Sequence, residues 1–187
     1  MSLDDARREA RCIYVCGAPG QLISSLVWFL SAALGTWVSW RAAMWALVAG
    51  GIFIFVALEA FIRLIGRRPS LSPGNPLNPL VMQIAFTLPF MLPLIVAAFR
   101  GQPDWLYPAF LVALGAHFLP FMFFFGLWHF GVIAMLLAGC GIVFGVVTTE
   151  AWQVAGWVGA VLQAVFAALL YSVYRQERGG RNTEEKT

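Results

Sequence analysis

Charged residues are scarce in this chain. Only 11% of its 187 residues are Asp, Glu, Lys or Arg, whereas soluble domains carry about 25%. The longest gap lies between Asp104 and Glu150, where 45 consecutive residues bear no charge. Only lipid makes so much apolar surface tolerable in a short chain, so a water-soluble fold is excluded.

Cysteine, histidine and catalytic motifs are also few. The three cysteines, Cys12, Cys16 and Cys140, cannot build a disulfide framework. Cys12 and Cys16 with His129 would supply only three metal ligands, without an apparent fourth. His117 and His129 are expected at depths too different for a shared haem. No nucleophile elbow, phosphate loop or HExxH motif occurs in the sequence. We therefore expect no catalytic residues, no metal and no cofactor.

The sequence does contain six apolar blocks of the length that crosses a bilayer as a helix, about 20 residues. The uncharged run must be two helices, because one helix would be about 68 Å long at about 1.5 Å per residue. We place its turn at residues 126–129. Barrel strands would alternate in polarity and be about half as long. The expected spans are Gly17–Trp40, Ala42–Ile65, Pro79–Phe99, Trp105–Phe125, Phe130–Thr149 and Trp152–Tyr174.

The predicted fold is therefore an all-α, polytopic transmembrane helix bundle of six spans. Residues 17–174 form the six-helix domain, and residues 1–16 form an N-terminal segment. Residues 175–187 contain no apolar side chain to bury, so we expect a disordered tail.

The basic residues predict the orientation of the bundle. Ten of the twelve Lys and Arg residues precede span one, follow span two or follow span six, and only Arg41 and Arg100 lie at the other end. The positive-inside rule then places both termini in the cytoplasm. Because these charges flank apolar spans, they indicate membrane lipid as a partner and not nucleic acid. Tyr107 and several tryptophans near the expected span ends are typical of interfacial anchors.

Ionisable side chains inside the spans are candidates for function, because each costs at least about 2.5 kcal/mol near the bilayer centre. Glu59 and Arg63 are four residues apart on one helical face, which suits either an interfacial ion pair or a proton-coupling carboxylate held by its arginine. His117 is the deepest ionisable residue, and Gln163 is expected at the same depth. A hydrogen bond between them would satisfy both side chains, and a substrate or proton site would use the same geometry.

Most of the polar side chains fall in the predicted cytoplasmic half of the bundle, and the other half is almost purely apolar. This distribution predicts a polar cavity open to the cytoplasm, with polar spans that merely pack together as the alternative. The candidate pocket residues are Ser24, Ser25, Glu59, Arg63, Gln83, His117 and Gln163.

Prolines interrupt two of the predicted spans. Pro89 and Pro93 lie in span three, and Pro108 and Pro120 in span four, so we expect both helices to be kinked. Discontinuous helices form substrate sites in transporters, although kinks also occur where neighbouring helices satisfy the freed carbonyls.

Small residues predict close helix packing on three spans. They recur at intervals of four, a spacing that lets backbones approach, and we expect the resulting faces to pack either within one chain or in a homo-oligomer. The residues are Ala46 and Gly50; Gly141 and Gly145; and Gly156, Ala160, Ala164 and Ala168.

Three segments resemble a family of small, uncharacterised bacterial integral membrane proteins: GAPGQLISSLVW, NPLNPL and YPAFLVALGAHFLPFMFFFG. The similarity covers roughly residues 14–145 and is most specific at residues 115–121, where the family has a GAHYLPF-type segment. This chain has Phe118 in place of that tyrosine, so it lacks the phenolic hydroxyl there. The resemblance implies a six-span protein of the bacterial inner membrane and draws attention to His117, but it implies no activity.

Three function classes follow. A small-solute or proton-coupled transporter is suggested by the prolines, Glu59 and His117. A non-catalytic membrane component that assembles with itself or partners is suggested by the small-residue faces. A membrane enzyme acting on a lipid or quinone is the third class.

Overall fold

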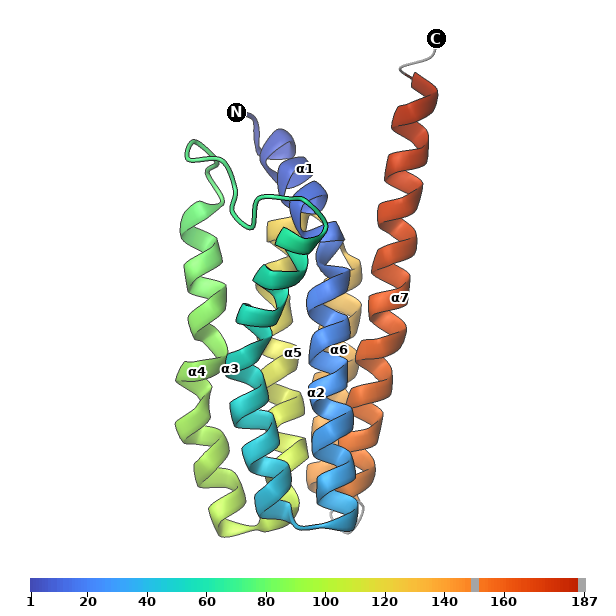
Figure 1. The fold of residues 1–187 in the computed structure, drawn as a ribbon. Coiled ribbons are helices and arrows are strands. Elements are labelled where there is room, and N and C mark those ends of the chain that lie inside the picture. Colours follow the sequence, from blue (N-terminus) through green and yellow to red (C-terminus); the bar gives the residue numbers. More distant parts are fainter. Residues whose placement is uncertain (149–151, 185–187) are drawn as a thin grey trace.

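The structure is a computed structural model that describes residues 1–148 and 152–184. Helices make up nearly all of this part of the chain, joined by short turns and one longer loop (Figure 1). Six helices in these described ranges are long and apolar enough to cross a membrane. These observations confirm the predicted all-α bundle of six spans.

Each predicted span corresponds to one helix. The boundaries agree within three residues, except at the end of the last span and at the predicted end of span five, Thr149, which lies outside the described residues. The turn predicted at residues 126–129 is also confirmed, with Gly126 in the left-handed conformation after the preceding helix (φ 67°). The spans are α2 (Ala18–Trp37), α3 (Trp40–Leu64), α4 (Asn78–Gly101), α5 (Leu106–Phe125, preceded by the short η2, Pro103–Trp105), α6 (His129–Ile142, extended by the π-helical η3, Val143–Val147) and α7 (Trp152–Glu184).

The end of α7 differs from the expectation of a disordered tail. The helix continues ten residues past Tyr174, to Glu184, and residues 185–187 lie outside the described part. Extending an existing helix costs far less than nucleating one, and Arg, Gln and Glu are good helix formers. In addition, Glu177 is held by an ion pair with Arg11, Nε to Oε1 2.9 Å.

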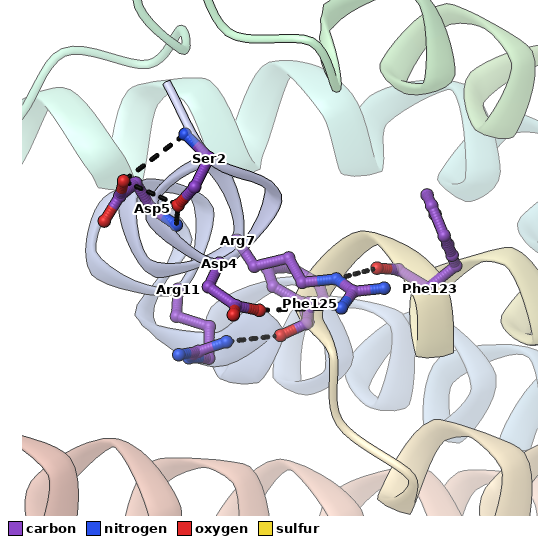
Figure 2. Close-up of polar contacts among 7 residues, drawn as sticks. All are labelled: Ser2, Asp4, Asp5, Arg7, Arg11, Phe123 and Phe125. Atoms are coloured by element: carbon purple, nitrogen blue, oxygen red, sulfur yellow. Dashed lines mark hydrogen bonds and ion pairs between the residues drawn. The ribbon is translucent and has the colours of Figure 1, made fainter.

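The N-terminal segment forms a separate helix, α1 (Leu3–Tyr14). Ser2 and Asp5 form a reciprocal capping box at its start (Figure 2), which satisfies backbone donors that have no partner inside the helix. The helix ends because Val15 and Cys16 adopt left-handed backbone angles, with φ of 52° and 54°. These residues and Gly17 make up the short η1 (Val15–Gly17) that joins α1 to α2.

Two arginines of α1 bind the end of α5. Arg7 Nε donates to the carbonyl of Phe123 at 2.9 Å, and Arg11 Nη1 donates to the carbonyl of Phe125 at 2.7 Å (Figure 2). The last four carbonyl groups of a helix have no N–H donor within the helix. The two guanidinium groups supply the missing donors and so cap α5. Because Arg11 also pairs with Glu177, α1 joins the ends of α5 and α7.

The helices pack unevenly. The closely packed pairs include α2 with α7, α5 with α6, α2 with α3, and α4 with α5, whereas α3 and α4 are not such a pair. Helix α1, the last turns of α7 and the loop of residues 65–77 lie at the same end of the bundle (Figure 1), which we call the terminal end. An even number of spans requires this arrangement.

Glycines allow the tightest of these contacts. A Cβ atom at Gly115 would lie 2.6 Å from the carbonyl oxygen of Ala134, and one at Gly141 would lie 2.7 Å from that of Pro108. On α7, a Cβ atom at Gly156 would meet the ring of Tyr107 at 2.8 Å. The small-residue faces around Gly141 and Gly156 therefore pack within one chain.

The prolines fall in two kinds of position. Pro89 and Pro93 lie inside α4, and Pro120 lies inside α5. Pro108, in contrast, is in the first turn of α5, where an N–H group has no partner within the helix. Pro108 therefore removes no hydrogen bond from the helix, and of the two prolines considered for a kink in this span only Pro120 lies inside α5.

The contact at Gly115 gives a test of this packing. We expect Gly115→Ala to destabilise the protein by about 1–3 kcal/mol, because the new methyl group meets backbone and forces α5 and α6 apart. Gly139→Ala is the matched control, since no atom lies within 4 Å of its added Cβ. Unfolding in mixed micelles of a denaturing detergent measures both variants. Equal stabilities would contradict the close approach at Gly115.

Candidate functional site

The bundle encloses a cavity of about 510 Å³. It lies where α3 and α4 do not pack together, and side chains of α2, α3, α4 and α5 form most of its wall. Its terminal end is closed by Tyr14 and Pro69. The lining is mainly aliphatic and aromatic and includes Leu47, Ile54, Leu58, Ile84, Leu88, Phe110, Leu114, Phe118, Phe121 and Phe125.

Besides Tyr14, whose hydroxyl donates to the carbonyl of Pro69, four side chains in the wall are polar: Gln21, Ser24, Glu59 and His117. Gln21 Oε1 and His117 Nδ1 are buried atoms without a hydrogen-bond partner among the described residues. The imidazole of His117 meets the ring of Phe121 edge-on, with centroids 5.3 Å apart. Buried polar atoms are nearly always hydrogen-bonded, and these two atoms are available to a hydrogen-bonding partner in the cavity.

The predicted hydrogen bond between His117 and Gln163 is wrong. Gln163 is fully buried, but its Oε1 accepts from Ser24 Oγ at 2.5 Å, and its Nε2 donates to the carbonyl of Gly159 at 3.2 Å. The reason is that α7 packs closely on α2, which brings Ser24 next to Gln163. Equal depth in the membrane does not determine which helical faces meet.

The other predicted pocket residues lie in different parts of the structure. Ser25 belongs with Gln163 to the interface between α2 and α7, because its hydroxyl donates to the carbonyl of Ala160 at 2.9 Å. Gln83 is exposed on α4 and does not line the cavity. Of the candidate residues, the structure brings Ser24, Glu59 and His117 together in one wall, and it adds Gln21.

Glu59 and Arg63 form the ion pair that their spacing indicated, with Oε1 and Nη2 2.5 Å apart. Their side chains are 52% and 66% exposed. Exposed pairs of this kind contribute about 1 kcal/mol or less. The geometry therefore matches the interfacial ion pair, and Glu59 lines the cavity near the terminal end of α3.

A polar contact that the sequence analysis does not predict lies in the half of the bundle expected to be almost purely apolar. Tyr107 is fully buried, and its hydroxyl lies 3.0 Å from Ser31 Oγ, which donates to the carbonyl of Ala43 at 2.9 Å. The expectation that Tyr107 is an interfacial anchor is wrong, because its ring packs against α2 and α7. The available signal was the helical spacing of Gln21, Ser24 and Ser31, which places polar groups on one face of α2.

Metal ligands do not gather in the described part of the chain. Its His, Cys, Asp and Glu side chains form no group of three that could hold an ion, and this includes Cys12, Cys16 and His129.

The buried contact between Ser24 and Gln163 can be measured by a double-mutant cycle. Ser24→Ala leaves the Oε1 atom of Gln163 buried without a donor, so we expect a loss of about 1–3 kcal/mol in the free energy of unfolding. In the Gln163→Leu background the same substitution should cost much less, because the orphaned acceptor is gone. Additive losses would show that the two side chains do not interact.

No curated protein and no solved structure matches the chain significantly. A family model matches residues 3–173, which include α1 and most of the length of all six spans. The chain belongs to the family of unknown function DUF7010.

Proposed function

We propose that this membrane protein binds and carries a molecule that dissolves in the bilayer, with a long apolar body and one hydrogen-bonding group. The cavity between α2, α3, α4 and α5 supports this proposal. Its wall is largely hydrocarbon and aromatic, as in most small-molecule sites, where a few polar groups fix the orientation of the ligand. The unpartnered atoms of Gln21 and His117 provide such groups.

The same wall argues against a hydrophilic solute. A solute with several polar groups would lose its water on entry, and each group left without a partner would cost about 1–3 kcal/mol. Glu59, the carboxylate considered for proton coupling, is exposed and paired with Arg63. Carriage of a lipophilic compound needs neither a hydrated path nor a buried carboxylate.

Exposed side chains in the cavity wall support an entrance through which a ligand reaches the cavity from the lipid. Ile52 and Phe55 line the cavity but are 69% and 54% exposed. We infer that the cavity opens sideways between α3 and α4. A molecule dissolved in the bilayer then reaches the site without crossing water.

We also propose that the terminal end faces the cytoplasm of a bacterial inner membrane. The arginines that precede α2, follow α3 and extend α7 all belong to this end. This excess of basic residues supports the orientation by the positive-inside rule.

Filling the cavity tests the proposal. Gly51 lines the cavity, and an added Cβ there has no atom within 4 Å, so Gly51→Phe should place its ring in the open volume without disturbing the helix. We expect at least a tenfold loss of photolabelling by a hexadecanol that carries a diazirine, mapped by mass spectrometry to α3 and α5. Gly139→Phe introduces the same ring at an open glycine outside the cavity wall and should label as the wild type does. Undiminished labelling of Gly51→Phe would contradict the proposal.

A second test concerns the polar group of the ligand. We expect wild-type protein to bind hexadecanol in preference to hexadecane, because His117 supplies a hydrogen-bonding partner for the hydroxyl. His117→Phe should reduce this preference by about five- to tenfold, the value of one hydrogen bond, while the affinity for hexadecane is kept. Competition with the diazirine probe measures both ligands. His129→Phe is the control, and an unchanged preference in His117→Phe would remove the role assigned to His117.

A further inference from the structure

A second hollow, of about 530 Å³, lies at the terminal end of the bundle. Its wall contains three arginines, Arg67, Arg68 and Arg178, and we call it the basic cleft. Arg67 and Arg68 come from the loop after α3, whereas Arg178 comes from the extension of α7. Tyr174 of α7 and residues of α1 complete the wall.

In the described part of the chain, no arginine of the basic cleft forms a salt bridge, although the charge of Arg68 acts on the Glu9 carboxylate in the same wall. Arg67 donates to the carbonyl of Cys12 and to the hydroxyl of Tyr174, which are neutral acceptors and leave its charge uncompensated. Arg178 lies over the Tyr174 ring, 5.8 Å from its centroid. Arg68 and Arg178 are exposed, so their guanidinium groups are accessible to a ligand.

The one carboxylate in this wall, Glu9, is already engaged by neutral donors. It accepts from the backbone N–H of Ser72 at 2.7 Å, from the Ser72 hydroxyl at 2.9 Å and from Asn75 Nδ2 at 2.9 Å. The hydrogen bond from Asn75 lowers the pKa of Glu9 below its ordinary value, so the group stays ionised at neutral pH. It fixes the loop on α1 and offsets only one of three positive charges.

We propose that the basic cleft binds a phosphate group, carried by an anionic phospholipid or present as free phosphate. Guanidinium groups match the oxygens of phosphate in charge and geometry. The exposed hydroxyl of Ser70, also in the wall, adds a neutral donor. Basic pockets at the ends of transmembrane helices lie at the level of lipid head groups. The site is separate from the apolar cavity, and this proposal does not depend on the function proposed above.

Removing charge inside and outside the basic cleft tests this inference. The cleft variant is Arg68→Gln with Arg178→Gln, and the matched control is Arg8→Gln with Arg175→Gln, which removes two exposed arginines from the same end but from outside the wall. Full-length protein in uncharged detergent is titrated with phosphatidylglycerol, phosphatidylcholine or inorganic phosphate, and the melting temperature is followed. All four arginines are exposed, so both variants should fold.

We expect phosphatidylglycerol to raise the melting temperature of the wild type and the control, and the cleft variant to bind it about thirtyfold more weakly. Stabilisation by inorganic phosphate with the same dependence on Arg68 and Arg178 would support the proposal with free phosphate as the source. Equal weakening of both variants would show attraction by general surface charge and overturn it. The proposal would also be overturned if neither phosphatidylglycerol nor inorganic phosphate stabilised the wild-type protein.

Discussion

The structure depends on one constraint: lipid offers no water to a backbone N–H or C=O group, so every such group inside the membrane must be satisfied by the protein. Continuous helices meet this requirement along most of each span, and in the described part of the chain only Pro89 and Pro93 inside α4 and Pro120 inside α5 remove a helical N–H donor. At the terminal end, arginine side chains satisfy carbonyls that the helices leave open. Arg7 and Arg11 bind the last turn of α5, and Arg67 binds the carbonyl of Cys12 in α1.

The same solvent decides how the helices associate. Lipid tails are as apolar as leucine side chains, so close van der Waals contact and hydrogen bonds must favour helix contacts over lipid. The pairs α2 with α7 and α5 with α6 have such contacts, through Gly159 against Trp28 and Gly115 against Ala134. Between its first and last turns α4 contains no glycine and packs mainly on α5. The cavity lies on the side where α3 and α4 lack a close backbone contact.

Sequence reasoning predicted the spans and their turns well, because hydrophobicity along the chain reports depth in the membrane directly. It failed where the rotation of a helix about its axis mattered. His117 and Gln163 were assigned to each other on depth, yet Gln163 faces Ser24 on α2 and His117 faces the cavity. Tyr107 was assigned to the interface on its place near a span end, but its hydroxyl binds Ser31 inside the bundle. Rotation is set by packing between helices distant in sequence, for which one sequence gives only the helical spacing of polar residues.

The contacts of the arginines at the terminal end could not be predicted from the sequence either. As charges counted along the sequence they indicated orientation, and their separate roles appear only when α1, the loop after α3 and the end of α7 are placed together. Tyr14 then donates to the carbonyl of Pro69 at 3.2 Å, and both residues line the apolar cavity. Their neighbours Ile13, Arg68 and Ser70 line the basic cleft. The contact between α1 and this loop therefore fixes a short piece of wall that separates the apolar cavity from the basic cleft. A shift of this piece of wall changes the shape of the cavity and of the cleft together.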